Sequence, residues 1–209
     1  STGAPQAKFP KIYTNHFSKL LLSREQIQSR TQEIAAYIHS HYPHDEPLVI
    51  VCILKGSSPF YHMLLHELSE LEHPYMFDFL RVKSYVGTES SGDVKILGEF
   101  PKSMEGRNVL IVEDIVDTGH TLSALLPQIT THERKPKSCS VCTMLVKRLG
   151  EEEHGKVTAN VDLEDNFVGF SIPNEFVVGM GLDYNEMYRD LMDIWILNKQ
   201  GILNGGYGL

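Results

Sequence analysis

The stretch 109–122 constrains this chain most, because it joins an apolar run, three acids and the start of a helical pattern. Its first four residues, Val-Leu-Ile-Val, are mostly β-branched, which predicts a strand buried on both faces of a sheet. Glu113 and Asp114 follow at once, then Asp117 and a Thr-Gly-His-Thr turn, and a helical pattern begins at Leu122. The order strand, turn and helix is typical of α/β folds.

The same stretch predicts a ligand site. Ligands of open parallel sheets bind outside the carboxyl ends of the strands. The free N–H groups and the dipole at the start of a helix suit a phosphate. Carboxylates do not bind phosphate, but they accept hydrogen bonds from hydroxyls, hold a metal or take a proton. The expected ligand therefore carries a phosphate at one end and a polyol beside it.

Further segments extend the α/β pattern. Apolar runs predict strands at 48–54, 75–82, 138–146 and 167–172, and 94–97 can pair back onto 75–82. Ser23 and Gln26 match a capping box, which predicts a helix that runs to about His41. A second helix is expected at 60–71. Because strands alternate with helices, the predicted fold class is α/β, with a mostly parallel twisted sheet and helices on both faces.

Length and composition indicate a single principal domain. The chain has 209 residues, of which 42% are hydrophobic and 22% charged, as is ordinary for a globular protein. We expect an N-terminal arm at 1–16, one domain at 17–197 and a C-terminal tail at 198–209.

Charge and cysteine content narrow the partners and the compartment. The 27 acidic residues exceed the 19 basic ones, a net charge of −8, which disfavours nucleic acid because phosphate backbones need clustered Lys and Arg. The apolar runs are far too short to span a membrane, and the first residues lack the features of a signal peptide. Three cysteines fit free thiols in a reducing compartment, so we expect a cytoplasmic protein without a membrane partner.

Two spacings look like ligand sites but have ordinary explanations. Cys139 and Cys142 form a C-x-x-C pair on an expected strand, where positions three apart point to opposite faces. We therefore interpret them as buried small residues. His62 and His66 lie one helical turn apart without an evident third ligand, and we expect a surface pair.

Several motifs together resemble a known family. The stretch 109–122 is similar to the phosphoribosyl-diphosphate signature of the type I phosphoribosyltransferases. The chain also carries Lys-Gly at 55–56, Lys-Ser-Tyr at 83–85, Val-Lys-Arg at 146–148, Phe-Val-Val-Gly at 176–179, Leu-Asp-Tyr-Asn-Glu at 182–186 and Arg-Asp at 189–190. This order resembles the members that act on 6-oxopurines and covers about 17–197. It implies a core with a small hood built from the N- and C-terminal segments.

The resemblance implies an enzyme of purine salvage. Family members use Mg²⁺ to transfer ribose 5-phosphate from 5-phosphoribosyl 1-diphosphate to N9 of hypoxanthine or guanine, which gives IMP or GMP and pyrophosphate. They are homodimers or homotetramers. The alternative is a catalytically weak paralogue that only binds the diphosphate donor or a nucleotide. A transferase for orotate or adenine is a nearer rival, but it needs a base pocket different from one formed by Lys147 and Phe176.

The resemblance also implies residue roles on the donor side. Glu113 and Asp114 would accept hydrogen bonds from the ribose hydroxyls. The 5′-phosphate would lie in the turn formed by Asp117, Thr118, Gly119, His120 and Thr121. The family usually has Lys where this chain has His120, so phosphate affinity could be lower or depend on pH. Pyrophosphate would contact Lys55, Gly56 and Arg189, and the Leu54–Lys55 peptide is often cis in the family.

On the purine side, Asp117 is implied as the base that takes a proton near N7. The purine would contact Lys147, Phe176, Val177 and Asp183. Lys147 is a donor without acceptor character, so it favours a 6-oxo group over a 6-amino group. Mg²⁺ would be held on the side of Asp183, with Glu113 and Asp114 as further carboxylates. Ser84 and Tyr85 would belong to a lid that excludes water.

Overall fold

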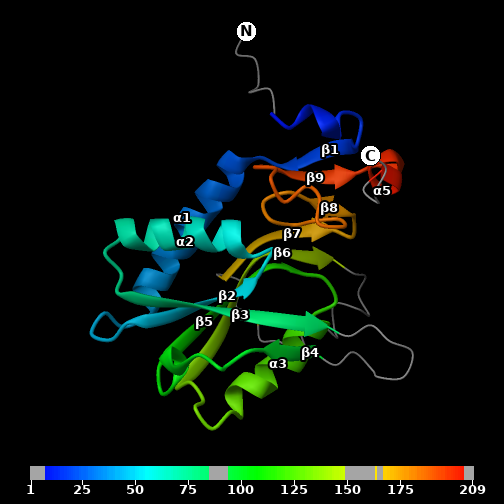
Figure 1. The fold of residues 1–209 in the computed structure, drawn as a ribbon. Coiled ribbons are helices and arrows are strands. Elements are labelled where there is room, and N and C mark those ends of the chain that lie inside the picture. Colours follow the sequence, from blue (N-terminus) through cyan, green and yellow to red (C-terminus); the bar gives the residue numbers. More distant parts are fainter. Residues whose placement is uncertain (1–7, 85–93, 149–162, 164–166, 205–209) are drawn as a thin grey trace.

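The computed structural model describes residues 8–84, 94–148, 163 and 167–204 (Figure 1). Within these residues, six strands form the main sheet in the order β4-β3-β2-β5-β6-β7. They are β2 (Leu48–Leu54), β3 (Tyr75–Ser84), β4 (Val94–Leu97), β5 (Asn108–Val116), β6 (Ser138–Arg148) and β7 (Val168–Pro173). Only the β3–β4 pair is antiparallel. The expected α/β class and mostly parallel sheet are confirmed.

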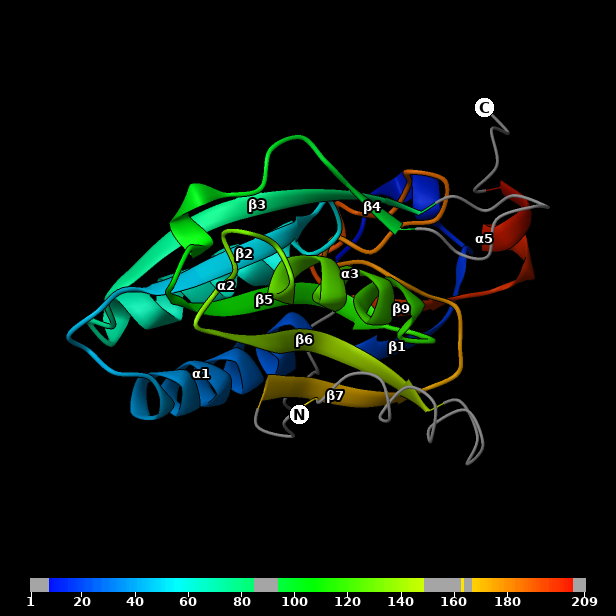
Figure 2. The ribbon, with the colours of Figure 1, turned by 90° about the horizontal axis from the view of Figure 1, so that it is seen from below.

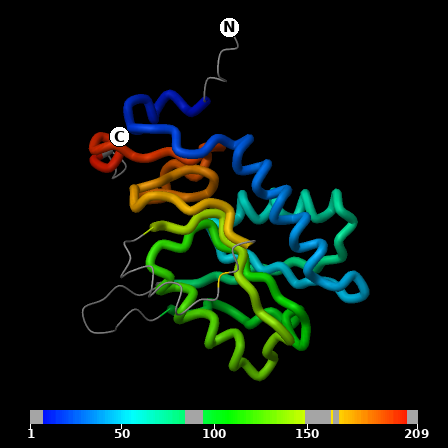
Figure 3. The backbone as a smooth tube through the Cα atoms, turned by 180° about the vertical axis from the view of Figure 1, so that it is seen from behind, coloured from blue at the N-terminus to red at the C-terminus, as the bar shows by residue number. Residues whose placement is uncertain are grey.

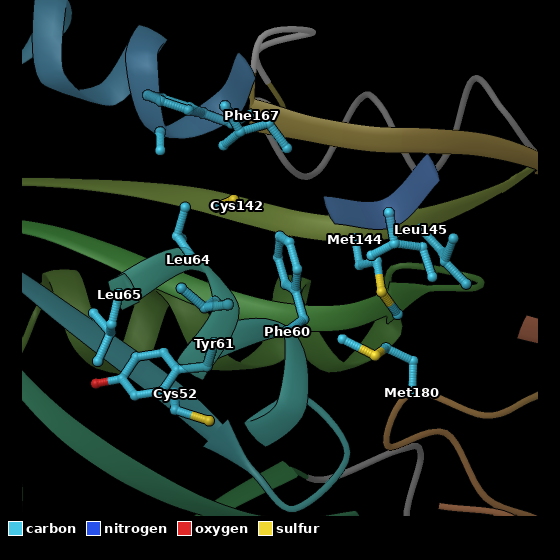
Figure 4. Close-up of a cluster of buried hydrophobic side chains, with 14 of the residues drawn as sticks. Cys52, Phe60, Tyr61, Leu64, Leu65, Cys142, Met144, Leu145, Phe167 and Met180 are labelled. Carbon is cyan, nitrogen blue, oxygen red and sulfur yellow. The ribbon is translucent and has the colours of Figure 1, made fainter. Parts of the chain in front are cut away.

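Helices cover both faces of this sheet (Figure 2). On one face, α1 (Arg24–His41) and α2 (Ser58–Glu70) share a buried core with the strands. Side chains of α2 such as Phe60 and Leu64 lie in this core with Cys142 and Met144 of β6 (Figure 4). On the other face, α3 (His120–Thr130) packs on a second core that includes Val109 and Ile111.

The predicted capping box is present at the start of α1. The Gln26 backbone N–H donates to Ser23 Oγ at 3.3 Å, and the Ser23 N–H donates to Gln26 Oε1 at 2.9 Å. These two bonds satisfy N–H groups that a helix start leaves without partners. The helix ends at His41, as predicted, and its isoleucines are buried at Ile27, Ile34 and Ile38.

A second, antiparallel sheet joins the two ends of the chain. Its order is β1-β9-β8, with β1 (Phe17–Leu22), β9 (Ile194–Leu197) and β8 (Val177–Val178). Seen from behind, the N-terminal and C-terminal segments run side by side (Figure 3). The rings of Phe17 and Trp195 stack at 5.0 Å between centroids, and Tyr13 lies 4.7 Å from Tyr188. This sheet is the expected hood.

Short elements complete the described chain: the 3₁₀ turns η1 (Lys11–Tyr13) and η2 (Lys102–Met104), and the helix α5 (Lys199–Asn204). The Tyr188 hydroxyl donates to the Gly201 carbonyl at 3.2 Å, so the first part of the expected tail contacts the hood. Residues 205–209 and 85–93, which include the expected lid residue Tyr85, lie outside the described residues. Among the described helices, none combines the length and apolar character that crossing a membrane requires.

The C-x-x-C pair points to the two opposite faces of β6, as expected; Cys142 is buried, as interpreted, whereas Cys139 is only partly buried. Cys142 lies in the core beneath α1 and α2, whereas Cys139 packs against the opposite core. Burial raises the pKa of Cys142 to about 12 and that of Cys139 to about 11. All three cysteines are free, and these two thiols remain protonated and unreactive at neutral pH.

Candidate active site

Strand β5 carries two acids to the carboxyl edge of the sheet. Its first five residues are buried, as the apolar pattern predicts, and the strand then delivers Glu113 and Asp114. Glu113 is only 6% exposed, and the Ser57 hydroxyl donates to its Oε2 at 3.2 Å. The Ile115 N–H donates to Asp114 Oδ1 at 2.8 Å. Both carboxyls are therefore held in place by the β5 backbone or by the β2–α2 turn.

The electrostatics of this pair favour proton uptake. Burial raises the pKa of Glu113, and the neighbouring Asp114 adds to the effect. Burial also raises the pKa of Asp114, while Arg189 opposes that shift by favouring the charged carboxylate. Carboxyls held in this way take up hydrogen-bond donors or a cation readily, because either one relieves the cost of burying charge.

The turn after β5 opens helix α3. Gly119 has φ +75°, in the left-handed region that favours glycine. The helical bonds of α3 begin with the Ser123 N–H, which donates to the Gly119 carbonyl at 2.9 Å. The N–H groups before Ser123 therefore lie outside the helical ladder, at the positive end of the helix dipole, and that of His120 donates to Thr118 Oγ1 at 3.4 Å.

A cavity of about 480 Å³ lies over this turn. It brings together the donor-side residues that sequence motifs identified: Gly56, Glu113, Asp114, Asp117, Thr118, Gly119, His120, Thr121, Asp183 and Arg189. Ser57 and Ile115 also line it and were not predicted. Ser57 follows Lys-Gly directly, so its position in a strand-to-helix turn was the available signal. Ile115 lies between the acids and had no polar signal.

A second cavity of about 250 Å³ adjoins the first. It is lined by Lys147, Phe176, Val177, Leu182 and four residues shared with the first cavity: Asp114, Ile115, Asp117 and Asp183. Thus the structure brings the predicted purine contacts to one place, beside the predicted sugar contacts. Tyr184 meets Phe176 edge-on, with ring centroids 5.1 Å apart.

Lys147 and Asp117 form an ion pair between the two cavities. The Lys147 Nζ lies 2.9 Å from Asp117 Oδ2. The Lys147 side chain is 12% exposed and that of Asp117 is 50% exposed. A lysine is this deeply buried only when its charge has a partner, so Asp117 fixes the lysine head where the two cavities meet.

The pyrophosphate candidates lie where β2 meets the 179–193 segment. Arg189 contacts Asp183 at 3.1 Å and donates to the Gly181 carbonyl at 2.7 Å. The Lys55 Nζ pairs with Glu186 at 2.8 Å, so its side chain does not line the large cavity, whereas Gly56 does. The Leu54–Lys55 peptide is cis.

The lid candidates are only partly placed. Ser84 is the last residue of β3, at the carboxyl edge of the sheet. Val82, two residues earlier in the same strand, lines the large cavity. Tyr85 lies outside the described residues.

Comparison with known proteins agrees with this geometry. The family described as "Phosphoribosyl transferase domain" matches residues 21–185. The chain belongs to the phosphoribosyltransferase family.

The relatives that it matches within that family carry hypoxanthine phosphoribosyltransferase names. It is 40% identical to the hypoxanthine-guanine phosphoribosyltransferase of Mycobacterium avium, over 96% of this chain and 95% of that protein. It is 42% identical to the bifunctional protein TilS/HprT of Listeria monocytogenes (strain F2365), over 89% of this chain but only 27% of that longer protein. A hypoxanthine phosphoribosyltransferase structure from Staphylococcus aureus is similar, with a TM-score of 0.78, 36% identity and coverage of 92% and 98% of the two chains. This places the chain with the hypoxanthine-guanine phosphoribosyltransferases.

Gly56 offers a first test of the site's geometry. A methyl group at this position would overlap Asp114 Oδ2 and lie 3.0 Å from its Cγ. We expect Gly56→Ala to push the Asp114 carboxylate out of place and to weaken donor binding at least about tenfold. Isothermal titration calorimetry with 5-phosphoribosyl 1-diphosphate measures this effect.

Gly106→Ala is the matched control for Gly56→Ala. Gly106 has φ +67° with no atom near an added Cβ, so the substitution costs backbone strain away from the cavities. It should lower the melting temperature without changing donor affinity. Unchanged donor affinity in Gly56→Ala would show that the Asp114 position does not matter for binding.

Proposed function

We propose that this protein catalyses Mg²⁺-dependent transfer of ribose 5-phosphate from 5-phosphoribosyl 1-diphosphate to N9 of hypoxanthine or guanine, a step of purine salvage. The products are IMP or GMP and pyrophosphate. One observation carries the proposal: the donor cavity and the base cavity adjoin, and the Asp117–Lys147 pair lies where they meet. A structure of the Trypanosoma cruzi hypoxanthine phosphoribosyltransferase with its product IMP shares 35% identity and a TM-score of 0.76, over 93% of this chain and 99% of that one.

The donor binds in the large cavity. Its 5′-phosphate takes the N–H groups and hydroxyls of the 117–121 turn, and its ribose hydroxyls donate to Glu113 and Asp114. These new hydrogen bonds favour the charged carboxylates, which offsets the effect of burial on their pKa. Pyrophosphate lies toward Gly56 and the guanidinium of Arg189, which reaches the cavity while paired with Asp183.

The purine occupies the smaller cavity. Its ring stacks on Phe176, which is 43% exposed and lines this cavity. The Lys147 ammonium donates to O6, and the Val177 backbone reads the opposite edge of the base. An adenine amino group is itself a donor and would face a cation at this position.

Proton transfer follows from the position of Asp117. When Lys147 turns to O6, the ion pair weakens and Asp117 becomes free to accept the proton near N7. The purine gains nucleophilic character, while the C1–O bond to pyrophosphate breaks with positive charge on the ribose. The nearby carboxylates stabilise that charge.

The acids also suit Mg²⁺. Glu113, Asp114 and Asp183 offer only oxygen ligands, which this ion prefers, and Asp114 and Asp183 line both cavities. When bound, Mg²⁺ neutralises charge on the pyrophosphate leaving group.

The cellular setting is also a proposal. Three free cysteines suit the reducing cytoplasm. The assembly expected from the resemblance is a homodimer or homotetramer, which light scattering on the purified protein distinguishes.

A four-base assay tests the function. The protein is incubated with 5-phosphoribosyl 1-diphosphate, Mg²⁺ and one of hypoxanthine, guanine, xanthine or adenine, and nucleotide formation is followed by chromatography. We expect IMP and GMP but little AMP. No nucleotide from any base would favour the alternative, a paralogue that only binds the donor. Turnover of adenine alone would contradict the assignment of Lys147.

His120 provides a separate test of the phosphate turn. Its side chain is exposed at the rim of the large cavity, where the family usually has lysine. We expect His120→Lys to tighten donor binding about two- to fivefold at pH 8, because it adds a permanent positive charge beside the phosphate. His41→Lys, at the far end of α1, is the control and should have no effect. Equal affinities for the His120→Lys and unmodified proteins would mean that the side chain at 120 does not reach the phosphate.

A further inference from the structure

Three histidines meet at the edge of the sheet opposite the active site. His39 lies in the last turns of α1, His44 in the loop before β2, and His73 in the loop before β3. Because β2 and β3 are parallel and both start here, this is the amino edge of the sheet (Figure 1). The acids of β5 lie at the carboxyl edge. The cluster is therefore separate from the residues proposed for phosphoribosyl transfer.

The three imidazoles are within reach of one another. One ring nitrogen from each histidine lies within 4.8 Å of those of the other two. Ring centroids are 4.2 Å apart for His39 and His44, 5.2 Å for His44 and His73, and 5.5 Å for His39 and His73. The arrangement draws on three segments of the chain, so it is not a product of helical periodicity.

The hydrogen bonding at this cluster is incomplete. His73 is 97% buried, since 3% of it is exposed, and within the described residues neither of its ring nitrogens has a hydrogen-bond partner. The buried Nδ1 of His39 also lacks one there. Leaving such groups unpaired in the protein interior is unfavourable. A ligand that bonds to ring nitrogens would recover part of that cost.

The hydrogen bond that His44 makes is one that metal-binding histidines use. His44 Nε2 lies 2.7 Å from the His39 carbonyl oxygen, so that nitrogen is the donor and Nδ1 can keep its lone pair. Metal-bound histidines commonly use their second nitrogen in this way, which orients the ring.

We propose that His39, His44 and His73 form a binding site for a divalent transition metal, with Zn²⁺ as the first candidate. Imidazole nitrogens suit zinc, copper and nickel, whereas Mg²⁺ prefers oxygen ligands. A tetrahedral zinc with Zn–N bonds of ~2.0–2.1 Å needs nitrogens about 3.3 Å apart. The three ring nitrogens lie within 4.8 Å of one another, so the side chains must move closer together for all three to bind one ion. Solvent beside His44 supplies the fourth ligand.

The bound metal joins the end of α1 to the loops that begin β2 and β3. The Leu48 N–H donates to the Pro74 carbonyl at 3.0 Å, so the two loops are already in contact next to the cluster. A metal held from all three segments restrains this edge of the sheet. Its expected effect is on stability, since the proposed catalytic residues lie at the opposite edge.

Calorimetric titration of the untagged full chain with Zn²⁺ tests the site. The titration is run in excess Mg²⁺, which occupies the carboxylates of the active site. We expect one zinc per chain and a rise in melting temperature on zinc addition. His44→Ala, at an exposed position, should weaken zinc binding at least about tenfold. Co²⁺ serves as a second probe, because a tetrahedral site gives it intense visible absorption bands.

The double variant His62→Ala/His66→Ala is the matched control. It removes two exposed imidazoles one helical turn apart on α2, outside the cluster. It should keep full zinc affinity. The proposal is overturned if the unmodified chain binds no zinc, if His44→Ala binds zinc as tightly as the unmodified chain, or if the control loses the binding. His73→Gln, which keeps a polar side chain, must show the same loss as His44→Ala in the fraction that folds.

Discussion

Asp117→Asn should slow phosphoribosyl transfer at least about tenfold while leaving donor binding nearly unchanged. Asparagine has almost the same shape, so the turn that carries Thr118 to Thr121 keeps its form. It cannot accept the proton from the purine, and general base catalysis typically contributes 10²- to 10⁴-fold. Single-turnover kinetics with hypoxanthine measure the chemical step, and calorimetry measures donor affinity.

The control for Asp117→Asn is Asp45→Asn, the same chemical change at an exposed position near the amino edge of the sheet. It should leave both quantities unchanged. An unaltered single-turnover rate in Asp117→Asn would show that another group takes the proton. A loss of donor affinity equal to the loss of rate would instead assign Asp117 to phosphate binding.

Lys147→Met should lower kcat/KM for hypoxanthine by about tenfold to a hundredfold. A hydrogen bond from a charged donor is worth about 1.5–3 kcal/mol, and every 1.4 kcal/mol is a factor of ten. Methionine fills similar space in a side chain that is 12% exposed, so the cavity should not collapse. The ratio of hypoxanthine to adenine turnover should fall, because the group that opposes the adenine amino group is gone.

Lys102→Met, at an exposed position in η2, controls for the loss of a positive charge. It should retain the kinetics of the unmodified protein. The Lys147→Met protein should also retain donor affinity, since the lysine lines only the smaller cavity. A fall in kcat/KM that is equal for all bases would argue that Lys147 positions Asp117 and does not read O6.

The parts of the site that are local in sequence were predictable from sequence. Strand β5, its acids and the turn at Gly119 follow one another directly, so the apolar run and the small residues predict both structure and place. The capping box at Ser23 was predictable for the same reason, because both partners lie within one helical turn.

The base cavity was not predictable from physical pattern alone. An isolated lysine is normally exposed and a phenylalanine normally buried. Here Lys147 is 12% exposed in its side chain while Phe176 is 43% exposed. The inversion depends on Asp117, thirty residues before the lysine, and on the hood, which presents Phe176. Only the family resemblance brought these positions together beforehand.

The histidine cluster had no sequence signal. His44 lies among loop residues near His41, and His73 follows a helix. Neither spacing matches a common metal motif, because the ligands come from three segments whose ends meet only when α1 and α2 pack on the sheet.

Two glycines make the donor site intolerant of substitution at their own positions. Gly56 leaves room for Asp114, and a side chain at Gly181, with φ +94°, would overlap the Gly56 carbonyl. Neither glycine takes part in the reaction. Each must lack a side chain, because the Asp114 carboxylate lies where a Gly56 side chain would be and the Gly56 carbonyl lies where a Gly181 side chain would be. Selection at these positions acts on an absence of atoms. A side chain at Gly181 would meet backbone, which no nearby substitution can remove, and one at Gly56 would meet the Asp114 carboxylate that the proposed function needs. Both glycines should therefore persist even where the surrounding residues diverge.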